Sequence, residues 1–236
     1  LPETLAIDEQ VLLREFSTAR TFEVRGEKRH IFDIAALTTT APDLGGWYTT
    51  EAQAQERFVA YCADGLRYYS TRRDSLASDV SDGSTSRMSV ALTWGLVSAR
   101  WLRKTIQDEL EDDFVRMTMK DGPMHLRAST QYLSELVWRE FYKYLFFHDP
   151  ALMDREFQER YRGTIAWTEE AEAVRRFEAW IRGETGYPVV DAAMRQIAAM
   201  GWMHNRSRMI VASVLTKNLG VDWRWGQEYF RAQLFD

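Results

Sequence analysis

The run Ser84-Thr85-Ser86-Arg87-Met88-Ser89 gathers four hydroxyl groups and a guanidinium directly before an apolar stretch that begins at Val90. That stretch predicts a helix. The first N–H groups of a helix lack partners, and together with hydroxyls and an arginine they suit the oxygens of a phosphate group. A simpler interpretation is that Ser84 or Ser86 caps the helix. The run therefore predicts either a phosphate-binding segment or a helix cap.

A second group of reactive side chains falls on one face of a predicted helix over residues 129–147. At 100° per residue this face covers one third of the circumference and presents an indole, a carboxylate, a guanidinium and a phenol. Its members are Glu135, Trp138, Arg139 and Tyr142. The opposite face is apolar except for Glu140, and we expect it to face the core; it carries Leu133, Leu136, Val137, Phe141 and Tyr144. The polar face indicates either a binding surface or a solvated face with an incidental tryptophan.

The stretch from Gly186 to Met209 predicts two consecutive helices. Pro188 suits the first position of a helix over 188–200, and Gly201 suits its left-handed end. A second helix is expected over 202–217, ending at Asn218 and Gly220. On one side of it lie Trp202, Asn205, Arg208 and Met209. An amide and an arginine are unusual in a core-facing stripe, whereas Met209 by itself would be typical of a core.

The remaining periodicity also predicts helices. One begins after Thr50 and is interrupted at Gly65, and two follow Val90 with a break at 95–98, where Ser98 could cap the second. Further helices are expected over 11–16, 169–182 and 223–234. No stretch shows the alternation of a strand, so we expect an all-α fold. Residues 1–50 are interpreted as a connecting region and 51–236 as one helical domain.

Composition limits the possible functions. The chain has 236 residues, 45% of them hydrophobic, with one cysteine and four widely separated histidines. These numbers leave little material for a zinc site, a Ser-His-Asp site or an internal disulfide, so we expect no metal. No apolar run is long enough to cross a membrane and no leader precedes the chain, which favours the cytoplasm. The net charge of −5 argues mildly against nucleic acid, although five basic residues in the last quarter could form a local groove: Arg206, Arg208, Lys217, Arg224 and Arg231.

Taken together, these segments resemble the flavin-binding helical domain of the photolyase and cryptochrome family, in its cyclobutane pyrimidine dimer photolyase branch. The resemblance rests on 84–89, on Glu135-Leu-Val-Trp-Arg-Glu-Phe-Tyr142, on 186–209 and on Val221-Asp-Trp-Arg-Trp-Gly226. It covers roughly residues 50–236 and implies a multi-helix FAD-binding domain. Family members also have an amino-terminal α/β antenna domain and continue past the position of Asp236, so we expect a fragment or a shortened form.

The resemblance implies a role for each matching residue. Pyrimidine dimers in DNA are the implied substrate, held by Glu135, Trp138, Asn205 and Met209. FAD is the implied cofactor, and its expected contacts are Tyr69, Thr85, Ser86, Arg87, Met88, Ser89, Tyr132, Arg139, Tyr142, Asn205, Arg208 and Asp236, with Arg208 paired to Asp236. Trp223 and Trp167 match the middle and outer members of an electron-transfer chain. The sequence departs from the family at Ser84 (usually glycine), Met88 (usually leucine) and Tyr132 (usually tryptophan).

Three functions are compatible with these residues. The first is light-driven repair of cyclobutane pyrimidine dimers by electron transfer from reduced FAD, in a monomeric protein. The second is a cryptochrome-like blue-light sensor, which would show flavin photoreduction without repair. The third is a cofactor-free helical interaction domain that retains the motifs without using them.

Overall fold

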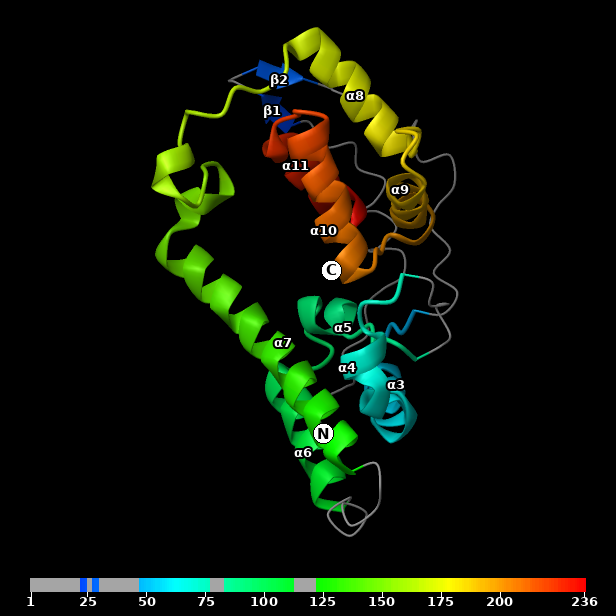
Figure 1. Cartoon of the computed structure of the whole chain (residues 1–236). Coiled ribbons are helices and arrows are strands. Elements are labelled where there is room, and N and C mark those ends of the chain that lie inside the picture. The colour runs from blue at the N-terminus through cyan, green and yellow to red at the C-terminus, as the bar shows by residue number, and fades with distance from the viewer. Residues whose placement is uncertain (1–21, 25–26, 30–46, 77–82, 113–121) are drawn as a thin grey trace. The chain divides into compact units, whose positions relative to one another are not determined.

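The computed structural model describes residues 22–24, 27–29, 47–76, 83–112 and 122–236 (Figure 1). These residues divide into two compact units. The first contains the described part of Tyr48–Phe157 together with Asp236, and the second contains Gln158–Phe235, Trp47 and two short strands. Each unit has its own set of helices.

The first unit begins with helix α3, Glu51–Asp64. The Thr50 hydroxyl accepts a hydrogen bond from the Gln53 N–H, and the Gln53 side chain accepts one from the Thr50 N–H, which forms a capping box. The predicted interruption at Gly65 is confirmed. A 3₁₀ turn η1, Leu66–Tyr68, and a short helix α4, Tyr69–Arg72, continue from there.

Three helices complete this unit: α5, Ser89–Thr93, α6, Ala99–Asp112, and α7, Gly122–His148. The Ser98 hydroxyl accepts from the Trp101 N–H at 3.1 Å, so the predicted cap of α6 is confirmed. Helix α7 starts earlier than the predicted residue 129, and it packs against η1, α4 and α6. A 3₁₀ turn η3, Pro150–Met153, follows it. The largest buried apolar side chains of the unit are Phe58, Leu66, Met88, Leu102 and Ile106.

The apolar face of α7 differs from the prediction. Val137, Phe141 and Tyr144 are 68%, 43% and 62% exposed, so the expectation that they face a core is wrong for the described residues. Helical periodicity identifies which side chains share a face, and it does not specify what covers that face.

The second unit contains a 3₁₀ turn η4, Glu159–Tyr161, and the helices α8, Glu170–Arg182, and α9, Pro188–Met200. Helix α10, Asn205–Ser213, continues into a π-helical turn η5, Val214–Asn218, and α11 covers Trp223–Gln233. Trp180 lies fully buried at the centre, and its indole N–H donates to the Val211 carbonyl at 3.0 Å. The core around it includes Phe177, Met194, Ile197, Met203, Leu215, Trp225 and Tyr229.

The predicted helix over 188–200 is confirmed, with Pro188 at its start and Gly201 at φ +60° after its end. The next helix begins at Asn205 and not at Trp202. The His204 imidazole caps it by accepting from the Arg206 N–H at 3.1 Å. Trp202 consequently lies before the helix, where its ring packs beside Trp47 at a centroid distance of 6.3 Å.

The all-α prediction is confirmed for the fold class, with one correction. Strands β1, Phe22–Val24, and β2, Glu27–Arg29, form a small antiparallel hairpin that sequence reasoning missed, because three residues are too few to show alternation. The helix predicted over 11–16 lies outside the described residues, and the division at residue 50 stays a prediction. In the described part of the chain, no helix is long and apolar enough to cross a membrane.

Candidate functional site

The segment Ser84–Ser89 is polar and largely buried. Ser84, Ser86 and Arg87 are only 4%, 7% and 8% exposed. Arg87 has a φ of +59° and is the only non-glycine residue with positive φ among the described residues. A left-handed backbone costs a residue with a Cβ about 1–2 kcal/mol and persists only where neighbours hold it. The neighbours that hold Arg87 are therefore part of the site.

Two buried tyrosines supply this support. The Tyr48 hydroxyl donates to the Arg87 carbonyl and accepts from the Ala91 N–H at 3.3 Å. The hydroxyl oxygens of Tyr132 and Ser86 lie 2.7 Å apart, and Ser86 Oγ also accepts from the Met88 N–H at 3.3 Å. Burial raises the pKa of Tyr48 to about 12 and raises the pKa of Tyr132 as well, so both phenols stay protonated at neutral pH.

These contacts bear on the capping interpretation of the segment. The residue that precedes α5 is Met88, and no side chain in the described part of the chain caps the helix. Ser86 turns back to the Met88 N–H, so the capping interpretation is wrong for this residue. Thr85 and Ser89 are half-buried, and neither hydroxyl is hydrogen-bonded to a described residue. Two hydroxyls beside a buried arginine are a donor set that fits phosphate oxygens.

The cluster continues through Tyr69, which is 8% exposed. Its ring lies 5.1 Å from the ring of Tyr132, and the Arg73 guanidinium lies 5.3 Å from its centroid. Arg73 also forms an ion pair with Glu135 of α7. Sequence reasoning missed Arg73. Its position one helical turn after Tyr69 was the available signal, because residues four apart share a helix face.

Helix α7 brings Glu135, Trp138 and Tyr142 together. Trp138 is 52% exposed and Tyr142 is 55% exposed, with ring centroids 6.1 Å apart. Arg139 lies apart from this trio, because its guanidinium donates to the Leu92 carbonyl at 3.2 Å and to the Glu140 carboxylate at 2.8 Å. The exposed trio offers aromatic surface next to a carboxylate whose orientation Arg73 fixes.

In the second unit, Asn205 and Met209 lie one turn apart on the exposed face of α10, and Met209 is 55% exposed. The Arg208 Nε donates to the Met203 carbonyl at 2.9 Å, which ties the first turn of α10 to the chain before it. Asp236 belongs to the first unit. The predicted pairing of Arg208 with Asp236 therefore stays a prediction.

The two tryptophans of the predicted electron-transfer chain are half-buried in the second unit. The Thr168 N–H donates to the Gly220 carbonyl at 2.9 Å, which ties the segment after Trp167 to the loop before α11. Trp223 is the first residue of α11, and the Arg224 guanidinium lies 4.7 Å from its ring centroid. Among the described residues no group of three or more His, Cys, Asp or Glu side chains could hold a metal ion.

Comparison with known proteins places these residues in a family context. Residues 132–236 match the family model described as the FAD binding domain of DNA photolyase. The deoxyribodipyrimidine photo-lyase of Salmonella typhimurium is 43% identical over 177 residues, which cover 75% of this chain and 34% of that enzyme. The enzyme of the same name from Vibrio cholerae is 38% identical over 207 residues, which cover 87% of this chain and 39% of the enzyme.

Solved structures agree with the sequence matches. A bacterial class III photolyase from Agrobacterium tumefaciens superposes with a TM-score of 0.67 at 34% identity, covering 82% of this chain and 36% of that one. A cryptochrome from Synechocystis gives the same TM-score at 30% identity, covering 81% and 36% of the two chains. The chain thus spans little more than a third of the length of these relatives.

Proposed function

Since the chain belongs to the photolyase and cryptochrome family, we propose that it binds FAD and serves the light-driven repair of cyclobutane pyrimidine dimers in DNA. The observation that carries the proposal is the Ser84–Ser89 segment. In this segment the buried Arg87 has a strained backbone, and the hydroxyls of Thr85 and Ser89 have no hydrogen-bond partner among the described residues. Such a segment has the donors that a dinucleotide cofactor's phosphates require.

The proposed FAD-binding set begins with this segment. Thr85 and Ser89 donate to phosphate oxygens, and Arg87 contributes positive charge. Ser86 and Tyr132 keep the segment in shape through their mutual hydrogen bond. The other proposed contacts are Tyr69, Met88, Arg139, Tyr142, Asn205, Arg208 and Asp236. When bound, FAD supplies light absorption and one-electron chemistry, and the protein's task is to orient it.

The residues proposed to bind the dimer lie on α7 in the first unit and on α10 in the second unit. The Trp138 indole offers a stacking surface for a base that has left the double helix, and Glu135 accepts hydrogen bonds from its edge. Arg73 holds the Glu135 carboxylate in one orientation through their ion pair. Asn205 and Met209 add an amide and a polarisable thioether from the exposed face of α10.

We also propose Trp223 and Trp167 as members of the electron-transfer chain, since the bond between Thr168 and Gly220 holds their segments together. A monomer in the cytoplasm is the proposed state. The chain has one cysteine, Cys62, which is buried, and burial raises the pKa of its thiol to about 12 and keeps it unreactive.

A repair assay tests the proposal. The purified chain is incubated with FAD, passed through gel filtration, reduced, and illuminated with blue light in the presence of single-stranded DNA that carries one thymine dimer. We expect retained flavin absorbance and light-dependent loss of the dimer, with no loss in the dark. The matched control is Thr85→Ala/Ser89→Ala, which should retain less flavin at unchanged helix content. A flavin-loaded sample that repairs nothing would contradict the proposal.

A cryptochrome-like light sensor is the second candidate, favoured by the structural similarity to the Synechocystis cryptochrome. The same sample separates the two, because a sensor undergoes flavin photoreduction without dimer loss. A protein that stays colourless after incubation with FAD would instead support a cofactor-free interaction domain.

A further inference from the structure

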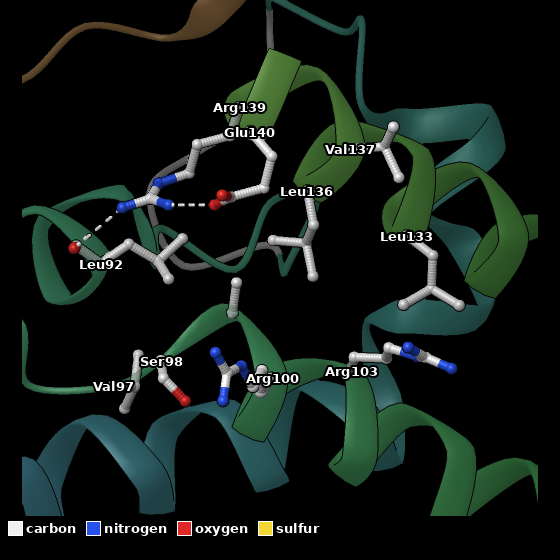
Figure 2. A pocket seen from close by; sticks show the side chains of 11 residues that line it. Leu92, Val97, Ser98, Arg100, Arg103, Leu133, Leu136, Val137, Arg139 and Glu140 are labelled. Atoms are coloured by element: carbon white, nitrogen blue, oxygen red, sulfur yellow. Dashed lines mark hydrogen bonds and ion pairs between the residues drawn. The ribbon is translucent and has the colours of Figure 1, made fainter. Parts of the chain in front are cut away.

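A pocket in the first unit lies between the start of α6 and the face of α7 that carries Leu133 and Leu136 (Figure 2). Its volume is about 780 Å³, which falls within the range typical of small-molecule sites. On α7 these two leucines point away from the side that carries Glu135 and Trp138, since helix geometry places them more than a quarter turn apart. The pocket therefore contains no residue of the proposed dimer-binding set or of the Ser84–Ser89 segment, and it shares only Arg139 with the proposed FAD contacts.

The walls of the pocket are apolar. Aliphatic side chains line it from both sides, namely Leu92 and Val97 from the chain before α6, and Leu133, Leu136 and Val137 from α7. Val137 is 68% exposed, so the described residues leave most of this side chain open to water. Burial of apolar surface of this kind by a ligand is favourable by about 25 cal/mol per Å².

The rim of the pocket is cationic. Arg100 and Arg103 on α6 both line it, and neither is hydrogen-bonded or ion-paired to a described residue. Figure 2 shows both arginines on the α6 side, opposite Leu136, while Arg139 and Glu140 face each other on the α7 side. Because Glu140 neutralises Arg139, the two arginines of α6 leave a net positive rim. An anion placed there would gain charge-assisted hydrogen bonds.

An apolar wall next to two available guanidinium groups defines a ligand class. We propose that this pocket binds an amphipathic carboxylate, with the apolar body against Leu133, Leu136 and Val137 and the carboxylate against Arg100 and Arg103. A neutral ligand would leave the guanidinium groups without an anion, and a cation would be repelled by them. The carboxylate contacts Arg100 and Arg103 are not among the residues proposed to bind FAD or the dimer.

Isothermal titration with decanoate tests the inference, with decylammonium as the matched ligand of opposite charge. We expect decanoate to bind saturably at one site, with an affinity that falls as salt screens the exposed arginines. Decylammonium should not bind. The double variant Arg100→Gln/Arg103→Gln should weaken decanoate binding by about tenfold or more, which corresponds to two lost charge-assisted bonds. Val137→Asp, at an exposed position, should weaken it as well.

Lys104→Gln is the matched control, because Lys104 is on the same helix, pairs with Asp108 at 2.8 Å and does not line the pocket. Decanoate affinity should be unchanged in this variant. Equal binding of decanoate and decylammonium, or full decanoate affinity in a folded Arg100→Gln/Arg103→Gln protein, would overturn the proposal. Displacement of decanoate by FAD would also overturn it, since the pocket would then belong to the cofactor site.

Discussion

The phenol of Tyr132 and the hydroxyl of Ser86 lie within 2.7 Å of each other, although the two residues are 46 positions apart in the sequence. In the family resemblance, Tyr132 occupies a position where tryptophan is usual. An indole has only an N–H donor, whereas a phenol can donate and accept. In this chain the phenol at position 132 forms the hydrogen bond that links α7 to Ser86 in the proposed phosphate-binding segment.

Replacing Tyr132 by phenylalanine should weaken FAD binding. The ring packing remains, but Ser86 loses its side-chain partner, so we expect about fivefold weaker affinity, equivalent to about 1 kcal/mol. Quenching of flavin fluorescence during titration measures the dissociation constant. Unchanged affinity in a folded variant would show that this hydrogen bond does not shape the segment.

Removing the hydroxyl of a neighbouring tyrosine, in Tyr61→Phe, should instead stabilise the protein. The Tyr61 ring lies 6.0 Å from Tyr132, but its hydroxyl is buried with no hydrogen-bond partner among the described residues. Removing a buried polar atom without a partner should raise the free energy of unfolding by about 1 kcal/mol. Urea denaturation measures the change. A destabilised Tyr61→Phe protein would indicate that a bound water satisfies this hydroxyl.

The ion pair between Arg73 and Glu135 should matter for the binding of damaged DNA. Arg73 is 12% exposed and Glu135 is 35% exposed, so water screens the pair only in part. We expect Arg73→Gln and Glu135→Gln each to weaken binding of dimer-containing DNA, with a coupling energy of about 1 kcal/mol in the double-mutant cycle. Additive effects in binding titrations would mean that the two side chains act separately.

Asp191→Asn should destabilise the protein in a pH-dependent manner. Burial raises the pKa of Asp191, but hydrogen bonds from the Thr185 hydroxyl and from the N–H groups of Thr185 and Gly186 outweigh it and hold the pKa below its usual value. Because the pKa of this carboxyl is lower in the folded state than in the unfolded state, its ionised form stabilises the fold at pH values above the unfolded pKa of about 4. This contribution is lost as the pH falls further.

At pH 7 we expect Asp191→Asn to lower the free energy of unfolding by about 1–3 kcal/mol, and the difference from the unmodified protein should shrink below about pH 4. Urea denaturation at several pH values measures both quantities. Asp108→Asn, at an exposed ion pair, should change stability by less than about 1 kcal/mol. A pH-independent difference would exclude the ionised carboxylate as the cause.

Gly201→Ala should destabilise the second unit more than Gly163→Ala. Both glycines have positive φ, +60° and +67°. A Cβ on Gly201 would also lie 2.6 Å from the Phe235 ring, whereas one on Gly163 meets nothing within 4 Å. We expect Gly163→Ala to lower the free energy of unfolding by about 1 kcal/mol through backbone strain alone, and Gly201→Ala to lower it clearly more. Thermal unfolding measures the difference, and equal losses would show that Phe235 moves aside without cost.

Local signals predicted much of the fold. Thr50, Ser98, Pro188 and Gly201 mark helix ends because their side chains or backbone angles act on adjacent residues. The sequence-based prediction placed the start of α10 too early. The residue that caps this helix is His204, and a histidine is not recognisable as a cap from the sequence pattern. The prediction also missed the hairpin of β1 and β2, whose strands are too short to show a period.

The candidate site was predictable in its residue types and less so in its geometry. The hydroxyls of 84–89 and the face of α7 could be identified by spacing. The contact of Tyr48 with Arg87 and that of Arg73 with Glu135 could not, because the partners are 39 and 62 positions apart. The exposure of Val137 and Phe141 was also unpredictable, as it depends on which other segments cover α7.

The support of Arg87 by Tyr48 has a consequence for how the protein folds. Residues 84–89 adjoin one another in the chain, yet their conformation depends on hydroxyls 39 positions upstream and 46 positions downstream. Contacts between such distant positions require large loops to close first, which costs entropy and slows their formation. The segment should therefore acquire its shape late in folding, and an isolated peptide of these six residues should lack it.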